Sequence, residues 1–119
     1  MILYNILHEN IHYNGIIYTY AEENMETDFN YIDCIEKVKQ HDDSASEALY
    51  RFTFPIAQKQ VALFVHNRQD QEDLLQTIFI KIFEQLHTLK EPEKYPGWAK
   101  MIARNTCMDY GRHLKLENN

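Results

Sequence analysis

The sequence contains few residues that interrupt or cross-link a chain. Three glycines and three prolines in 119 residues leave room for long helices. The two cysteines have no CxxC spacing, which favours reduced thiols in a cytoplasmic protein over a disulfide framework. No stretch approaches the ~18 consecutive apolar residues that suggest a membrane span. There is no glycine-rich phosphate loop and no nucleophile–base pair, so we expect no enzyme activity, cofactor, metal ion or membrane partner.

Cationic residues are missing from the first 36 residues, which contain seven acids. From Lys37 onward, the chain has all twelve of its Lys and Arg residues against the remaining eleven acids. The net charge of −6 argues against indiscriminate binding to nucleic acid, because phosphate contacts need a clustered cationic surface. A local basic face is still compatible with these numbers.

Apolar periodicity predicts an all-α protein, a compact bundle of about four helices within residues 29–116. The expected helices cover residues 29–40, 43–66, 70–88 and 98–114. The second helix should begin with Asp43 or Ser44 as N-cap, with Glu47 completing a capping box. Pro55 should bend this helix, because proline lacks the N–H donor.

The third expected helix, DQEDLLQTIFIKIFEQL, has one continuous apolar stripe. The stripe consists of Leu75, Ile78, Phe79, Ile82, Phe83 and Leu86. The opposite side consists of Asp73, Gln76, Thr77, Ile80 and Glu84, with Leu74 on a flank. Periodicity alone interprets this polar side as a solvent-exposed face, and acids at a helix start are also favoured by the helix dipole.

Three segments occur in a characteristic order: SEALYRFTFPIAQKQVALFV, DQEDLLQTIFIKIFEQL and, after a proline-containing loop, GWAKMIARNTCMDYGR. From Asp33 to Lys115 the chain resembles the second conserved region of bacterial sigma factors, particularly of the extracytoplasmic-function group. The resemblance implies the sigma region-two fold. It also implies binding to core RNA polymerase, with recognition and melting of the promoter −10 element during transcription initiation.

In this family the acidic-D-L-x-Q helix docks on a coiled coil in the clamp of the polymerase largest subunit. By position, the implied polymerase contacts are Asp70, Glu72, Asp73, Leu74, Gln76, Thr77 and Ile80. Carboxylates would pair with clamp cations, while Leu74 and Ile80 would supply apolar contact. Gln71 replaces a usually small residue and Thr77 a common acid, and we expect both to weaken docking without removing it.

The resemblance further implies that the loop Glu91–Gly97 and the last helix bind the non-template strand of the −10 element and capture a flipped base. This task needs cations for phosphates, aromatic surfaces for stacking and amides that read base edges. The implied DNA contacts are Trp98, Lys100, Met101, Arg104, Asn105, Asp109, Arg112 and Lys115. Asn105 is the first choice for base reading. The alternative is that Trp98, Ile102 and Met108 are simply core residues.

Complete family members carry a second domain for the −35 element, and none follows Asn119. Three hypotheses remain open at this point. The chain is part of a longer sigma factor, or a stand-alone partner of a second sigma chain that carries the −35-binding domain, or a regulator that occupies the clamp without reading DNA. An anti-sigma factor is a further expected partner.

Residues 1–28 are interpreted as an acidic N-terminal extension, either a hairpin or a disordered segment. Asn14-Gly15 between alternating aromatic and aliphatic residues predicts the hairpin. One hypothesis is that Met25 is the natural start, since Glu22-Glu23-Asn24 can be encoded by a sequence resembling a ribosome-binding site. The rival hypothesis is a genuine module that masks the DNA-binding face or adds a hairpin.

The segment HENIH, His8–His12, matches the HExxH pattern of zinc metalloproteases. That chemistry requires a helix and a third ligand. The segment runs directly into the expected Asn14-Gly15 turn, and the other four histidines have no ligand spacing. We interpret the match as coincidental and keep the metalloprotease as a remote alternative.

Overall fold

The structure, a computed structural model, describes residues 29–118, with side chains placed as far as Leu114. It contains the helices α3 (Tyr31–Lys39), α4 (Asp43–Phe64), α5 (Arg68–Gln85) and α6 (Tyr95–Asn118), with short 3-10 turns η1 (Leu86–Thr88) and η2 (Pro92–Lys94). The predicted all-α bundle of about four helices is confirmed over this range. No helix in this range is long and apolar enough to cross a membrane. The expected hairpin, the acidic extension, the HENIH segment and the Met25 start lie outside the described residues.

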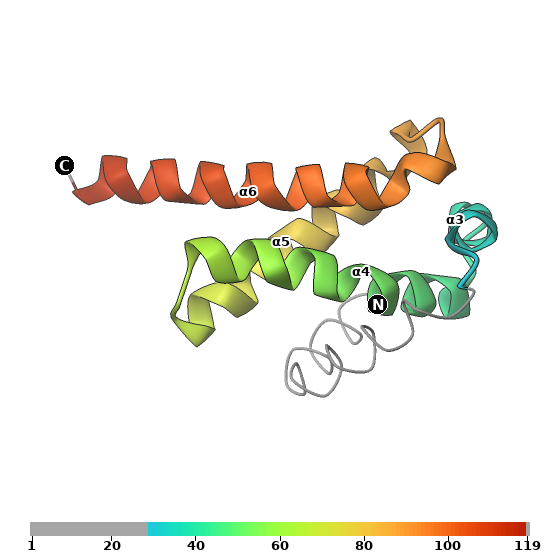
Figure 1. Ribbon diagram of the computed structural model, residues 1–119, viewed down its shortest axis with the longest axis horizontal. Coiled ribbons are helices and arrows are strands. Elements are labelled where there is room, and N and C mark those ends of the chain that lie inside the picture. The colour runs from blue at the N-terminus through green and yellow to red at the C-terminus, as the bar shows by residue number, and fades with distance from the viewer. Residues whose placement is uncertain (1–28, 119) are drawn as a thin grey trace.

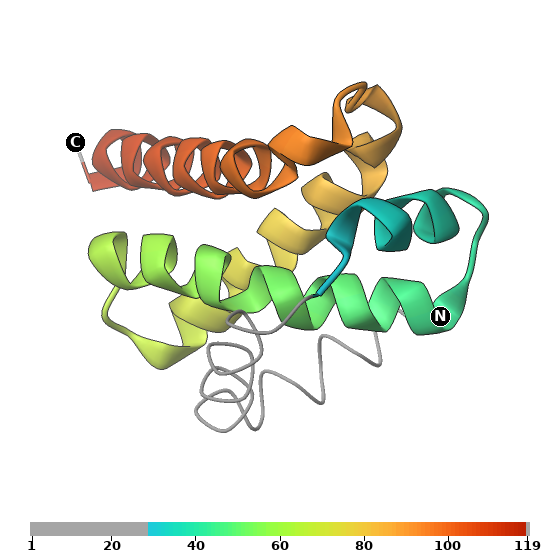
Figure 2. The same cartoon turned by 45° about the vertical axis from the view of Figure 1, so that its right-hand side comes forward.

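The two longest helices, α4 and α6, lie side by side and run in the same direction (Figures 1 and 2). The chain leaves α4, turns back through α5, and reaches the start of α6 through η1 and η2 (Figure 1). The short α3 packs against the N-terminal part of α4. This arrangement leaves the first turns of α5 and the outer side of α6 at the surface.

The start of α4 differs from the sequence prediction. Its N-cap is Asp42, whose carboxylate accepts a hydrogen bond from the Ala45 N–H at 2.9 Å, so the predicted caps one and two residues later are wrong. The predicted capping box does not form either, because Glu47 pairs with Arg51 at 2.6 Å. The helix continues through the buried Pro55 without ending there.

The α5 and α6 helices both begin earlier than predicted. Asn67 caps α5 by accepting from the Asp70 N–H at 3.1 Å, so the helix already includes Arg68. The α6 helix begins at Tyr95, with Pro96 in its first turn. Proline is tolerated there because first-turn N–H groups have no intrahelical acceptor.

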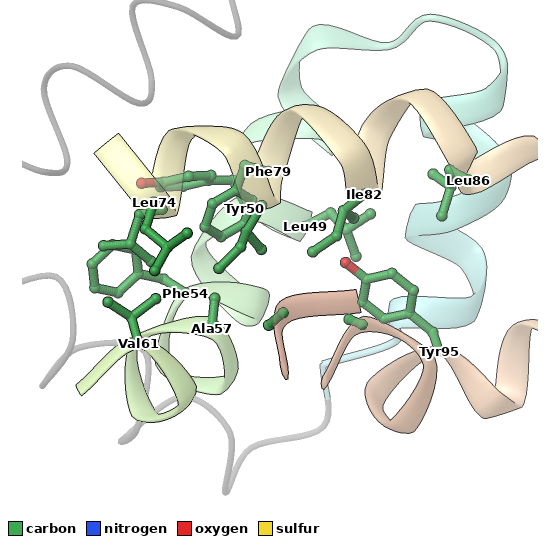
Figure 3. Packing of buried hydrophobic residues seen from close by; sticks show 14 of the residues in the cluster. Leu49, Tyr50, Phe54, Ala57, Val61, Leu74, Phe79, Ile82, Leu86 and Tyr95 are labelled. Atoms are coloured by element: carbon green, nitrogen blue, oxygen red, sulfur yellow. The ribbon is translucent and has the colours of Figure 1, made fainter. Parts of the chain in front are cut away.

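The core lies where α4, α5 and α6 meet (Figure 3). Of the stripe predicted for α5, Leu75, Ile78, Phe79, Ile82 and Leu86 are buried, and Phe83 is half-buried against them. The ring of Tyr50 from α4 packs on Phe79 with 4.2 Å between ring centroids. The predicted core face of α5 is therefore confirmed.

Both cysteines are buried and unpaired. The thiol of Cys34 in α3 donates to the carbonyl of Ala45, which links α3 to α4. Burial raises the pKa of the Cys34 thiol and raises that of Cys107, in α6, to about 11. Both thiols are therefore protonated and unreactive in the folded protein at neutral pH.

A buried hydrogen bond joins the start of α6 to α4. The hydroxyls of Thr53 and Tyr95 lie 2.6 Å apart, and the Thr53 hydroxyl also donates to the carbonyl of Leu49. The Tyr95 hydroxyl is therefore the donor to Thr53. The Tyr50 hydroxyl, elsewhere in the core, is also buried but has no hydrogen-bond partner among the described residues. Burial raises the pKa of both tyrosines, so both are neutral.

This contrast predicts opposite outcomes for two matched substitutions. Tyr95→Phe should lower the free energy of unfolding by about 1 kcal/mol, because a satisfied buried hydrogen bond is lost. Tyr50→Phe should leave stability unchanged or raise it, because only an unsatisfied hydroxyl is removed. Urea unfolding followed by far-UV circular dichroism measures both. Equal losses in the two variants would contradict the assigned roles.

Candidate functional site

The first turns of α5 form an acidic surface that is held by local hydrogen bonds. The guanidinium of Arg68 pairs with Glu72 at 3.2 Å, and the amide of Gln69 donates to Asp73 at 3.2 Å. Since both pairs join residues four apart, they fix the side chains along the helix surface. The carboxylate of Asp70 lies on the same turns, next to the cap Asn67.

Six of the seven residues predicted on α5 for polymerase contact are accessible to solvent, either fully or in part. Asp73, Thr77 and Ile80 are exposed, with Ile80 at 43%. Asp70, Glu72 and Gln76 are half-buried. We call these six residues the α5 polar face.

The seventh predicted residue, Leu74, does not belong to this face. It is only 5% exposed, and Figure 3 shows it among the core side chains of α4 and α5. The flank position that periodicity assigned to Leu74 is covered by α4. Its expected role as an apolar surface contact therefore does not fit the structure, and Ile80 is the exposed apolar member of the set.

The two residues that depart from the sigma pattern both turn toward the protein's own backbone. The amide of Gln71 donates to the carbonyl of Val65 at 2.8 Å, which ties the end of α4 to the start of α5. The hydroxyl of Thr77 donates to the carbonyl of Asp73 at 3.1 Å. The larger Gln71 side chain thus stabilises the turn between α4 and α5.

A second surface follows one side of α6. Exposed side chains recur there at helical spacing, while the opposite side of the helix is buried through Ala99, Ala103 and Cys107. We call this surface the α6 outer face; its members are Lys100, Met101, Arg104, Asn105, Met108 and Arg112. The face combines three cations and one amide with two exposed methionines, at 59% and 43% for Met101 and Met108. These are the group types that contact phosphates, base edges and base faces.

The other predicted DNA contacts lie at the borders of this face. Asp109 is half-buried and pairs with Arg112 one turn later. Trp98 is half-buried against the core, with its ring 5.9 Å from that of Tyr95. Both interpretations of Trp98 thus have support, since one side packs and the other is accessible. The side chain of Lys115 lies outside the described part.

An open pocket of about 770 Å³ lies between the loop before α6 and the first turns of α6. Trp98, Pro96 and Met101 supply apolar surface. Two lysines and two glutamates, Lys90, Glu91, Glu93 and Lys94, also line the pocket, and Lys94 pairs with Glu91 at 2.6 Å. Pockets of this size accept ligands larger than a nucleobase. The pocket therefore places an aromatic surface, charged side chains of both signs and the first residues of the α6 outer face around one cavity.

Among the described residues, no group of three or more His, Cys, Asp or Glu side chains is placed to hold a metal ion. The α5 polar face and the α6 outer face are instead surfaces suited to macromolecules, because they consist of exposed charged, amide and apolar side chains along helices.

Comparison with known proteins identifies the family of the part of the chain that contains these two faces. The family model described as Sigma-70 region 2 matches residues 47–116, which is more than half of the chain and includes α5 and most of α6. The chain belongs to the sigma-70 region 2 family. Searches of curated proteins and of solved structures found no match.

Sigma-70 region 2 is a domain of transcription initiation factors and is not a known enzyme family. Membership supports a sigma-factor role for this region 2 domain in RNA polymerase binding and promoter recognition. The resemblance stated from the sequence is thereby confirmed at the level of the family.

The sequence interpretation missed some residues of the candidate DNA surface. Met108 was named only in the alternative interpretation as a core residue, but it is exposed, about two helical turns after Met101, and helical spacing from Met101 would have found it. Lys90 lies just before the Glu91–Gly97 loop that was assigned to DNA, and it lines the pocket together with Lys94 from within that loop. No periodic signal exists in an irregular segment, so the position of Lys90 could come only from the folded chain.

The correction at Leu74 can be tested by stability alone. Leu74→Ala should lower the free energy of unfolding by about 2–5 kcal/mol, as for other buried leucines. Ile80→Ala on the same helix should change it by less than about 1 kcal/mol, because Ile80 is exposed. Thermal or urea unfolding distinguishes them. If Leu74→Ala lowered the free energy of unfolding by less than about 1 kcal/mol, Leu74 would be a surface residue and not a core residue.

Proposed function

We propose that this region 2 domain binds core RNA polymerase through the α5 polar face and promoter DNA through the α6 outer face. The DNA site is the non-template strand of the −10 element, and binding there assists melting. The observation that carries the proposal is the opposite charge of the two faces. One face is acidic and the other is basic with an adjoining aromatic pocket, and both fall inside the matched residues. Such a protein works in the cytoplasm and belongs with the extracytoplasmic-function group.

The α5 polar face suits a basic, partly apolar protein partner, which is the clamp coiled coil of the largest polymerase subunit. Asp73 is exposed at its centre, Gln76 lies beside it, and Ile80 adds apolar surface one turn beyond. Charges at such an interface guide association and set its specificity more than its total affinity. The local pair between Arg68 and Glu72 neutralises one of the three carboxylates, which leaves Asp70 and Asp73 as the main acidic contacts.

The α6 outer face suits a single DNA strand. Lys100, Arg104 and Arg112 follow one side of the helix as phosphate contacts, and Asn105 between them presents an amide to a base edge. The pocket beside Trp98 then receives an unstacked base. Three cations on an acidic chain give weak affinity for free duplex DNA, so binding depends on the polymerase bringing the strand to the domain.

Two further partners complete the proposal. A sigma factor needs recognition of the −35 element as well, and we assign this to a separate domain, in a longer chain or in a second sigma chain. An anti-sigma factor would act by covering one of the two faces.

The docking half of the proposal predicts a loss of polymerase binding. Asp73→Ala and Gln76→Ala should each weaken binding to core polymerase by about tenfold, because each removes a polar contact at the centre of the α5 polar face. Glu36→Ala, which removes an exposed acid on α3, is the matched control and should bind normally. Biolayer interferometry with immobilised core enzyme measures this. Normal binding by both α5 variants would exclude this face as the docking surface.

The DNA half predicts a defect that appears only after polymerase has bound. Arg104→Ala and Asn105→Ala should bind core polymerase normally but reduce promoter opening, by about tenfold per lost contact. Lys37→Ala on α3 is the control for loss of a cation. Permanganate footprinting of the −10 region measures opening, with any missing −35 domain supplied as a second chain. Full opening by both α6 variants would leave a regulator that occupies the clamp without reading DNA.

A further inference from the structure

Residues 89–93, which lead from η1 into η2, form part of the pocket beside Trp98, and we call them the pocket segment. The first three belong to no helix or strand. Leu89 and Glu93, at the two ends of the segment, both line the pocket. Because this stretch lacks the regular hydrogen bonds of a helix or strand, contacts with other elements must determine its position.

Two side chains of α3 hold the pocket segment, one at each end. The ammonium group of Lys39 donates to the backbone carbonyl of Leu89 at 3.2 Å. The hydroxyl of Tyr31 donates to the backbone carbonyl of Glu93 at 3.1 Å. Tyr31 and Lys39 are the first and last residues of α3, which also packs against η2. Since both acceptors are backbone atoms, the two contacts fix the path of the segment itself.

The ring of Tyr31 is in turn held by other aromatic rings. It stacks on Phe52 of α4 with 5.3 Å between ring centroids, which restrains the direction of its hydroxyl. It also lies 6.4 Å from the ring of Tyr95, which lies 5.9 Å from the ring of Trp98. Aromatic rings at these separations are in contact. Tyr31 thus supports the pocket both through the backbone of Glu93 and through the residue that packs beside Trp98.

We propose that Tyr31 and Lys39 are positioning residues for the pocket, and that α3 holds the pocket segment in the shape that receives an unstacked base. This inference rests on the proposed function, because it takes the pocket to be the site of that base. Neither residue lines the pocket, so both act through the pocket segment. Both precede residues 47–116, which the family model matches, and neither belongs to the α5 polar face or the α6 outer face. Their removal should therefore affect DNA and leave polymerase binding intact.

Hydrogen–deuterium exchange on the full chain tests the structural step without DNA. The double variant Tyr31→Phe with Lys39→Met removes both donors but keeps the aromatic ring and most of the aliphatic stem. The amide of Lys94 donates to the carbonyl of Glu91 at 2.9 Å, and it should exchange about tenfold faster in this variant. Amides in the middle of α4 and α5 should keep their wild-type rates. Wild-type exchange of the Lys94 amide in the double variant would overturn the proposal.

The matched control is Lys37→Met. Lys37 is a cation of the same helix that pairs with Asp33 within α3 at 3.1 Å instead of reaching the pocket segment. This variant should leave exchange in the pocket segment unchanged. Equal acceleration by Lys37→Met would mean that α3 as a whole has loosened, and this outcome would also overturn the assigned roles.

Promoter opening by the complex with core polymerase tests the functional step. The double variant should bind core polymerase normally but open the −10 region about tenfold less, as measured by permanganate footprinting, because the pocket is no longer held in shape. Lys39→Met alone should reduce opening, whereas Lys39→Arg, which keeps a donor, should open the promoter as the wild type does. Equal defects in Lys39→Met and Lys39→Arg would overturn the role of Lys39 as a donor.

Met101→Asp separates this inference from the proposed function. It places an acid in the pocket at a position that is 59% exposed, so folding should be retained while a DNA strand is repelled. Reduced opening by Met101→Asp together with full opening by the double variant would overturn only the positioning roles. Full opening by Met101→Asp would overturn the pocket as the site of the base, and the positioning roles with it.

Discussion

The structure depends on the small residues that α6 buries. Ala99, Ala103 and Cys107 recur every four residues and are fully buried on the side that faces the rest of the bundle. Small side chains allow two helices to approach closely, and the interaxial distance depends on the side chains at the contact. Because the inner side of α6 is occupied by small residues, its long and charged side chains are confined to the other side. The close packing of α4 and α6 thus determines which residues form the α6 outer face.

The orientation of α6 is also fixed at its first turn. Tyr95 is fully buried and donates to Thr53, so a rotation of α6 about its axis would leave the buried Tyr95 hydroxyl without its acceptor. Trp98 packs beside Tyr95 while lining the pocket. Tyr95, which fixes the helix, is therefore in contact with Trp98, which is proposed to receive a base. The wall of the pocket is supported by the packed core. A site supported by a packed helix positions its groups more accurately than a site on a free loop.

How far the sequence predicts this structure depends on the kind of information that each feature needs. The core stripe of α5 was predicted correctly, because six apolar positions at helical spacing give a strong signal. Leu74 was misplaced, because an angle on a helical wheel does not show how far a neighbouring helix extends around it. The start of α6 was placed three residues late, because Pro96 and Gly97 were interpreted as loop residues although both are compatible with a first helical turn. The residues of the two candidate faces were assigned by family resemblance, and the structure then showed that one of them, Leu74, is buried in the core.

The distribution of charge follows from the same architecture. Acids at the start of α5 are favoured by the helix dipole, and the cap Asn67 satisfies one of the free N–H groups of that turn. Of these acids Asp73 is exposed and Asp70 and Glu72 are half-buried, because α5 begins at the outside of the bundle (Figure 1). Cations collect on the α6 outer face, where they are separated from these acids by the buried core. The proposed acidic protein-binding surface and the proposed basic DNA-binding surface therefore lie on different helices of one small domain.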